Sequence, residues 1–333
     1  MTGSMLDFIC VLLLALAIDL IAGDPVWMPH PVRWIGRAAV LFERVLRPVA
    51  CSPFMERFCG AVFALAVVGL AYAVTAALLY LAYSRSFLVF SALCVYIIWT
   101  CLAIRSLGDE ALSVLSALNA DGTGGDGPGG IEAARKRLAR IVGRDTENLS
   151  KEAVLKASAE TVAENTSDAV VAPLFYLALG GPALMMAYKA VNTLDSMAGY
   201  KNAKYIRFGW ASARLDDAAN FVPARLTALL MVMASFILSY NWRGALRTVI
   251  RDAGKHPSPN SGWPEAAVAG ALGIRLGGAS TYNGIPFEKP FIGDGTARIM
   301  SGTALSAIKM MYSSAFIMVI ATVIIRKAVL LLL

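Results

Sequence analysis

Residues 160–168 read ETVAENTSD, and the chain continues as AVVAPLFYLALGGPALMMA before polar residues return in YKAVNTLDSMAGY (188–200). The apolar part approaches the roughly 20 residues that a helix needs to cross a bilayer. It is not a plain span, because Pro173 and the run Gly180-Gly181-Pro182 interrupt a regular helix. In a membrane, the backbone groups freed by such a break must line a cavity or be buried in protein. This stretch therefore predicts a broken or re-entrant span.

The composition of the whole chain is typical of a membrane protein. It has 333 residues, of which 57% are hydrophobic and 16% charged, whereas soluble domains carry roughly 25% charge. Apolar runs of spanning length recur near 8–22, 58–83, 87–104, 169–191, 219–240 and 303–325. We therefore predict an all-α, polytopic membrane helix bundle with five to six spans, forming a single membrane domain over residues 1–333.

The positive net charge of +7 is explained by membrane topology. With six spans and an external N-terminus, loops 33–57, 105–168 and 241–303 face the cytoplasm, and they hold most of the Lys and Arg. Basic loops of this kind also contact anionic lipid, so no nucleic-acid partner is needed to explain the charge. We expect a multi-pass protein of the cell inner (cytoplasmic) membrane.

The region 105–168 is predicted to be a cytoplasmic helical insertion. Its glycine-rich stretch DGTGGDGPGG (121–130) has the composition of a flexible linker and lacks the G-x-x-x-x-G-K-[ST] phosphate loop. Apolar residues at helical spacing follow it, namely Ile131, Ala134, Leu138 and Ile141. A second helix is expected over 150–164, with Ser150 suited to cap its N-terminus.

Polar residues bracket the broken span on both sides. The six are Glu164, Asn165 and Asp168 before it, and Lys189, Asn192 and Asp195 after it. Those after the span recur at helical spacing, which places them in one stripe. Because ionisable groups are costly in a membrane, such clusters are functional candidates. The alternatives are a helix cap for the first cluster and an interfacial anchor for Lys189; we favour a site.

Three other clusters share this character. They are Asp24, His30 and Arg33 in a proline-stiffened loop; Asp216, Asp217, Asn220 and Arg225; and Arg251, Asp252, His256, Asn260 and Glu265 in a stretch (251–278) interpreted as a loop of turn residues. Both histidines of the chain precede a proline, which restricts their backbone to extended conformations. Each imidazole is therefore presented from a fixed backbone, a feature compatible with either a structural or a site role.

The residue types indicate a phosphorylated substrate bound with Mg²⁺. Carboxylates and Asn without Cys or His ligand pairs are hard oxygen ligands of the kind that Mg²⁺ prefers. Lys189, Arg214, Arg225 and Arg251 suit phosphate. The chain has no Gly-x-Ser-x-Gly elbow, HExxH or dinucleotide-binding fingerprint. From the residues alone, we predict a membrane enzyme.

Five strings, in order from about Gly23 to Gly278, resemble the CbiB/CobD family of cobalamin biosynthesis, the adenosylcobinamide-phosphate synthases. They are GDPVWMPHPVRWIG, AENTSDAVVAPLFY, YKAVNTLDSMAGY, DDAANFVPARL and RDAGKHPSPNSGWPEAAVAGALGIRLGG. The resemblance implies an ATP- and Mg²⁺-dependent ligase that joins the free propionate of the corrinoid adenosylcobyric acid to (R)-1-amino-2-propanol O-phosphate, or to the free amino alcohol. It also implies, as partners, cobalamin synthase and other enzymes of nucleotide-loop assembly.

Within that reaction we expect particular residues to act. Mg²⁺ would be held by Glu164, Asp168 and Asp195, and phosphates by Lys189, Arg225 and Arg251. Either His256 or Asp217 would take the ammonium proton before the amine attacks. Asp24, His30 and Arg33 would frame the corrin or the aminopropanol phosphate, and Asn165, Asn192 and Asn260 complete the expected binding residues.

Two other classes of protein remain open. An intramembrane prenyltransferase also uses Asp-rich helices to hold Mg²⁺-diphosphate, and the strings NTLD and DDAAN are faintly similar to its motifs. The other class is a non-catalytic membrane sensor of the same family. Such a sensor has no need of so many paired carboxylates and cations, and corrinoid-binding and ATPase assays would separate it from an enzyme.

Overall fold

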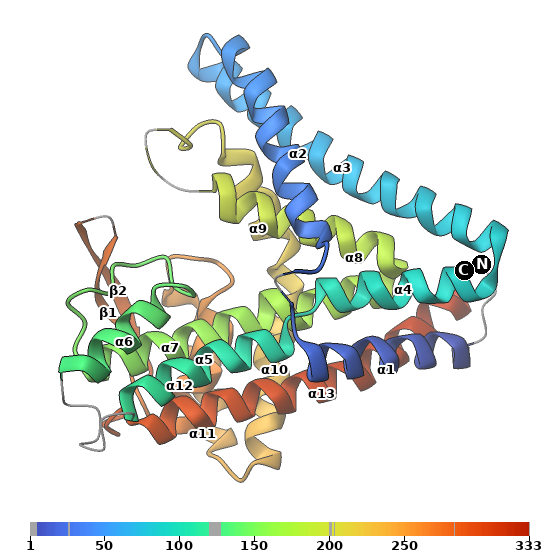
Figure 1. Cartoon of the computed structure of the whole chain (residues 1–333). Coiled ribbons are helices and arrows are strands. Elements are labelled where there is room, and N and C mark those ends of the chain that lie inside the picture. The colour runs from blue at the N-terminus through green and yellow to red at the C-terminus, as the bar shows by residue number, and fades with distance from the viewer. Residues whose placement is uncertain are drawn as a thin grey trace. The chain divides into compact units, whose positions relative to one another are not determined.

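The computed structural model describes residues 5–25, 27–119, 128–199, 202, 204–282 and 284–332, and within them helices dominate (Figure 1). The α-helices are α1 (Met5–Ala22), α2 (Pro31–Leu46), α3 (Pro53–Arg85), α4 (Phe87–Cys101), α5 (Ile104–Asn119), α6 (Pro128–Leu138), α7 (Lys151–Thr166), α8 (Ala172–Ala198), α9 (Trp210–Ala219), α10 (Phe221–Ile237), α11 (Trp242–Asp252), α12 (Gly262–Leu272) and α13 (Ser301–Leu332). Short helices are η1 (Arg47–Val49), the π-helix η2 (Ser167–Val171) and η3 (Ala253–Lys255), and two strands are β1 (Leu276–Tyr282) and β2 (Ile285–Ile292).

The predicted fold class, a helical polytopic membrane protein, is confirmed. In the part of the chain that the structure describes, five helical segments are long and apolar enough to cross a membrane, or six if the bent pair α9–α10 forms one span. One of the five is the 48-residue segment Lys151–Ala198, which contains the predicted broken span. The chain is therefore a multi-pass membrane protein by the length and composition of its helices.

The break in α8 occurs where the sequence predicts it. Gly180 (φ −134°, ψ 15°) and Gly181 (φ 72°, ψ −167°) leave the helical conformation, and Pro182 follows them. A positive φ such as that of Gly181 is readily adopted only by glycine, because it has no Cβ. Upstream, the π-helical turn η2 ends two residues before Pro173, a residue that cannot donate to an α-helical ladder.

The chain divides into two compact units. The first comprises Met1–Ala103, Ala172–Asn220 and Val319–Leu333, and the second comprises Ile104–Val171 and Phe221–Met318. The predicted insertion 105–168 falls within the second unit, together with the later segment. The single membrane domain and the insertion remain predictions. Residues 121–127 of the predicted linker (121–130) lie outside the described residues, and α6 begins at Pro128.

In the first unit, α1 runs beside α4, and α8 packs against α3, α4 and α9 (Figure 1). Ser86 separates α3 from α4, because its backbone is extended and its hydroxyl accepts the Leu88 N–H as the N-cap of α4. Close backbone approach requires glycine where α3 meets the turn before α9: a Cβ on Gly60 would lie 1.9 Å from the Phe208 carbonyl oxygen.

In the second unit, α5, α6, α7, α10, α11, α12 and part of α13 enclose one apolar core. The predicted face of α6 is confirmed, since Ala134 and Leu138 are fully buried in this core, and Ile131 and Ile141 pack against it. The start of α7 is confirmed as well, because the Ser150 hydroxyl accepts the Ala153 N–H. Substituting such an N-cap by alanine typically costs about 1 kcal/mol.

The interpretation of 251–278 as a loop of turn residues is wrong. This stretch contains α12 and the start of an antiparallel hairpin, in which β1 pairs with β2 and Ser280 lies opposite Phe287. The sequence holds a signal for the hairpin that this interpretation overlooked, because Asn283-Gly284 lies between aromatic and β-branched residues, a strong hairpin pattern.

Candidate functional site

The predicted site residues are divided between the two units. The first contains Asp24, His30, Arg33, Lys189, Asn192, Asp195 and Asp217. The second contains Glu164, Asn165, Asp168, Arg225, Arg251, His256 and Asn260. Each unit therefore has its own set of charged and polar candidates.

Asp216 is the centre of a polar cluster in the first unit. Asn220 Nδ2 donates to Asp216 Oδ2 at 3.0 Å, and the Asn192 side chain also hydrogen-bonds this carboxyl group. Asp195 and Asp217 are its charged neighbours. The other oxygen, Asp216 Oδ1, is buried and has no hydrogen-bond partner among the described residues. The cluster therefore presents a carboxylate oxygen that is available to a cation, and Asp216 is a site residue that sequence reasoning named but gave no role.

Two tyrosines lock this cluster in place. The Tyr188 hydroxyl donates to Asn220 Oδ1 at 2.8 Å, and Asn220 is 1% exposed. The Tyr176 ring stacks on Tyr188 with centroids 5.0 Å apart, and its hydroxyl donates to the Ala219 carbonyl at 2.9 Å. These contacts fix the end of α9 against α8. Sequence reasoning missed both tyrosines. Each lies far along the chain from its partner, with separations of 32 and 43 residues, so no local spacing predicts the contact.

Lys189 lies on α8, one residue after Tyr188, and is half-buried. Within the described ranges its ammonium makes no hydrogen bond and no ion pair. Both Lys189 and Asp24 act electrostatically on Cys101 of α4, so the fold brings these two sequence-distant charges into one neighbourhood. An uncommitted ammonium here fits the predicted contact with a phosphate better than it fits a structural ion pair.

His30 forms the first of two histidine–proline corners. Its Nδ1 accepts the Val32 N–H at 3.3 Å and caps α2, and its Nε2 lies 3.6 Å from Asp24 Oδ1. An Nδ1 that accepts places the ring proton of a neutral histidine on Nε2, facing the carboxylate. Arg33 NH1 donates to the Met28 carbonyl at 3.4 Å. The predicted group of Asp24 and His30 is thus assembled, and Arg33 also contacts the loop backbone.

His256 forms the second corner, in the second unit. Its Nδ1 accepts the Ser258 N–H at 3.0 Å, and its Nε2 lies 3.8 Å from Glu265 Oε1. The two side chains are only 6% and 1% exposed. In the described part of the chain, His256 Nε2 and both Glu265 carboxyl oxygens lack a hydrogen-bond partner. Buried polar groups without partners are rare, and each calls for an explanation.

Burial sets the protonation of this corner. It lowers the pKa of His256, as does the nearby Lys289 charge, so the ring is held neutral. Burial also raises the pKa of Glu265 well above its ordinary value, and the neighbouring Glu160 and Glu164 charges act in the same direction. Glu265 was named in the sequence without a role, and the structure makes it the carboxylate partner of His256.

Two glutamates of α7 lie near this corner. Glu160 pairs with Arg144 at 2.6 Å and accepts the Gly277 N–H at 2.8 Å. Glu164 accepts from the Ser261 hydroxyl at 2.8 Å. Sequence reasoning missed Glu160, although its spacing of four from Glu164 is a helical signal. Close by in the chain, Asn165 donates to the Thr161 carbonyl at 3.0 Å, and Asp168 lies in η2.

The predicted phosphate-binding arginines of the second unit are held differently. The Arg225 guanidinium lies over the rings of Phe221 (3.5 Å) and Trp263 (4.4 Å) and donates to Asn260 Oδ1 at 3.4 Å. Arg251 instead donates to both oxygens of Asp252, at 2.8 and 2.7 Å, and to Asp294 at 2.6 Å. This pairing lowers the pKa of Asp252. A phosphate would have to compete with two carboxylates for Arg251.

The three predicted Mg²⁺ ligands do not all belong to one unit, because Glu164 and Asp168 lie in the second and Asp195 in the first. Over the described ranges, no group of three or more His, Cys, Asp and Glu side chains is placed to hold a metal. Mg²⁺ at phosphate-transfer sites is usually bound by one or two carboxylates, completed by substrate phosphates and water. Asp195 and Asp216, with its unpartnered Oδ1, fit that smaller donor set.

The sequence is similar to known proteins over nearly its whole length. The family profile described as CobD/Cbib protein matches residues 12–311. The chain belongs to the CobD/CbiB family. Among CobD relatives, the cobalamin biosynthesis protein CobD of Pelobacter propionicus is 47% identical over 310 residues, covering 93% of both chains. The protein of the same name from Geobacter metallireducens is 46% identical over 314 residues, covering 93% of this chain and 94% of its own.

Membership of the CobD/CbiB family confirms the predicted resemblance and gives the chain a role in cobalamin biosynthesis as an enzyme. Family membership therefore favours an enzyme of cobalamin biosynthesis over the prenyltransferase alternative. No solved structure matches the chain. The arrangement of its site residues therefore follows from the contacts within this chain alone.

Proposed function

We propose that this protein catalyses the ATP-dependent formation of an amide bond between adenosylcobyric acid and (R)-1-amino-2-propanol O-phosphate, which gives adenosylcobinamide phosphate. With free aminopropanol as the amine, the product would be adenosylcobinamide. The observation that carries the proposal is the Asp195–Asp216 carboxylate neighbourhood, with its unpartnered oxygen, in a member of the CobD/CbiB family. We place this activity at the inner membrane, beside cobalamin synthase and other enzymes of nucleotide-loop assembly.

Activation of the carboxylate is assigned to residues of the first unit. The free propionate of adenosylcobyric acid does not acylate an amine unless it is activated. ATP would therefore first convert this substrate carboxylate to an acyl phosphate. Asp195 and Asp216 would hold Mg²⁺, which when bound neutralises charge on a transferring phosphoryl group. The uncommitted ammonium of Lys189 would contact the same phosphoryl oxygens, where charge develops during transfer. Asn192 and Asn220 orient Asp216 through their hydrogen bonds.

Proton transfer from the amine is assigned to the His256 corner. The Nδ1 of His256 accepts the Ser258 N–H, which leaves the ring proton on Nε2, facing Glu265. In this tautomer Glu265, when ionised, is the proton acceptor, and His256 is the residue that positions it. A carboxylate whose pKa is raised above its ordinary value is a stronger base, once ionised, than an ordinary one. Asp217, predicted as the other possible base, lies 3.6 Å from Arg214.

The proposal is tested with purified protein in detergent. Adenosylcobyric acid, ATP, Mg²⁺ and aminopropanol phosphate should give adenosylcobinamide phosphate, detected by mass spectrometry. Asp195→Asn and Asp216→Asn should each abolish most of this turnover while the protein still folds. The control is Asp109→Asn, because Asp109 is an exposed carboxylate paired with Arg105. Absence of an amide product from folded protein at saturating Mg²⁺ would overturn the proposal.

A further inference from the structure

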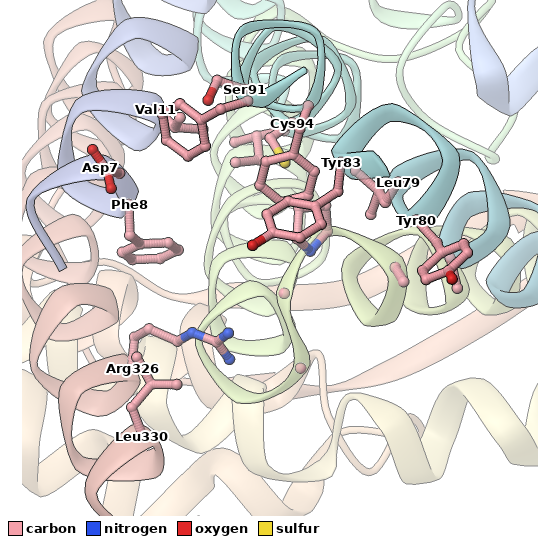
Figure 2. A pocket seen from close by; sticks show the side chains of 18 of the residues that line it. Asp7, Phe8, Val11, Leu79, Tyr80, Tyr83, Ser91, Cys94, Arg326 and Leu330 are labelled. Carbon is pink, nitrogen blue, oxygen red and sulfur yellow. The ribbon is translucent and has the colours of Figure 1, made fainter. Parts of the chain in front are cut away.

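The first unit contains a cavity of about 280 Å³ at the break in α8 (Figure 2). The start of α1, the second half of α3, one side of α4 and the end of α13 contribute its other walls. In the view of Figure 2, Phe8 and Arg326 lie on one side and Tyr80 and Tyr83 on the other. Most of the lining is apolar or aromatic, which suits a hydrocarbon chain.

The broken helix itself forms part of the wall. Gly180, Gly181, Pro182 and Ala183 all line the cavity. A Cβ built on Gly181 would meet nothing within 4 Å, so the backbone there faces open space. Backbone that leaves the helical conformation within a membrane is tolerated where it lines a cavity, and in broken transmembrane helices such a point often marks a binding site.

Arg326 brings a positive charge to this apolar cavity. Its only hydrogen bond within the described chain goes to the Leu179 carbonyl, at 3.5 Å, and the Phe8 ring centroid lies 5.9 Å from its guanidinium carbon. Among the described residues it forms no ion pair. A guanidinium has five N–H donors, so most of them remain without a protein partner. A cation in a membrane span is costly unless an anion or water meets it.

The position of the cavity along the helices matches the edge of the membrane. Tyr80 and Tyr83 lie in the last turns of α3, which ends at Arg85. Arg326 lies near the end of α13, which ends at Leu332. Tyrosines are enriched at the membrane–water interface, and long cationic side chains near helix ends reach toward it. The anions at this level of a bilayer are lipid phosphates.

We propose that this cavity binds one phospholipid molecule of the surrounding membrane, with its phosphodiester on Arg326 and one acyl chain between the aromatic side chains. Guanidinium and phosphate match in charge and in the geometry of their paired hydrogen bonds. Asp7 lines the same cavity, so its charged lining includes one cation and one anion. This lining suits a zwitterionic lipid, phosphatidylethanolamine, better than an anionic one.

Native mass spectrometry tests the proposal with the whole chain. Delipidated protein is incubated with phosphatidylethanolamine, phosphatidylglycerol or soluble glycerol phosphate, and the retained adducts are counted. We expect one phosphatidylethanolamine per chain, less phosphatidylglycerol and no glycerol phosphate. Arg326→Gln should reduce lipid retention about tenfold or more, the effect of losing a hydrogen bond to a charged group. The matched control is Lys327→Gln, because Lys327 is the neighbouring cation, exposed and outside the cavity lining.

Three results would overturn the proposal. If Arg326→Gln and Lys327→Gln retain equal amounts of lipid, lipid binding reflects a general attraction between cations and headgroups, and Arg326 forms no specific site. Tight binding of glycerol phosphate would make the site a small-anion site, and a preference for phosphatidylglycerol would exclude the zwitterionic occupant. If Arg326→Gln does not fold, Ser91→Phe fills the same cavity without changing a charge. That variant must also lose the lipid.

Discussion

The two histidine–proline corners have the same local geometry but different surroundings. In each, Nδ1 accepts the N–H two residues on, from Val32 or Ser258, and Nε2 lies 3.6 or 3.8 Å from a carboxylate. Asp24, beside His30, is 29% exposed, whereas Glu265, beside His256, is 1% exposed. The proline step presents the ring from an extended backbone in both corners, and in the second corner burial, together with the charges of nearby residues, lowers the pKa of His256 and raises that of Glu265.

The largest expected effect comes from replacing the buried carboxylate. Glu265→Gln removes a general base, and this should lower kcat by about 10²- to 10⁴-fold. The matched change in the exposed corner, Asp24→Asn, should act mainly on the KM of one substrate. Steady-state kinetics of both variants measure the contrast. Similar losses of kcat in the two variants would break the distinction between the corners.

Lys189, which shares a neighbourhood with Asp24, should show the next largest effect. Guanidinium is planar and forked where ammonium is a compact charge, so Lys189→Arg should misplace the contact with a transferring phosphoryl group. We expect kcat to fall on the order of a hundredfold, with little change in corrinoid affinity and normal membrane expression. A variant with wild-type kcat would return Lys189 to an anchoring role, since either cation can reach the headgroups.

A smaller effect is expected from changing the histidines themselves. Asparagine can still accept the N–H two residues on, so His256→Asn and His30→Asn preserve both turns while removing Nε2. His256→Asn should lower kcat by about tenfold, because Glu265 loses the Nε2 group that lies 3.8 Å from its carboxylate, and should shift the pH profile of kcat/KM. His30→Asn should leave that profile unchanged. An unshifted profile in His256→Asn would show that His256 does not position the base.

The smallest expected effect is on stability and depends on pH. Burial raises the pKa of Glu265 above its ordinary 4.5, so the folded protein keeps a proton that the unfolded chain loses. The free energy of unfolding should therefore fall as pH rises from about 4.5 toward the raised pKa, and the contribution is fully present only below that window. Thermal unfolding in detergent across this range should show the slope in the wild type. Glu265→Gln should flatten it, and an equal slope in both would contradict the assignment.

Much of the fold was predictable because its signals are local. Apolar length indicates the spans, Gly180-Gly181-Pro182 indicates the break, and Ser150 indicates the start of α7. The Asn283-Gly284 signal for the hairpin is local too, and it was overlooked.

The candidate site was only partly predictable. The pair Asp216–Asn220 follows from a spacing of four on a helix, and its hydrogen bond is present in the structure. Tyr188 joins Asn220 across 32 residues, and such a contact depends on how α8 and α9 pack, which no periodicity encodes. Burial of Glu265 is likewise a property of packing, and the sequence alone gave it no role.

One residue of the hairpin, Gly277, is held through both its N–H and its carbonyl by side chains of α7. Glu160 accepts the Gly277 N–H, and Lys156 donates to the Gly277 carbonyl at 2.6 Å. The partners in these two contacts are separated by 117 and 121 residues of sequence. At about 5–20 residues per second, a ribosome completes α7, which ends at Thr166, about 6 to 22 s before it reaches Gly277. Arg144, already synthesised, can neutralise Glu160 during that interval. The order of synthesis therefore lets the ion pair form first, and the hairpin docks onto a helix whose buried charge is already balanced.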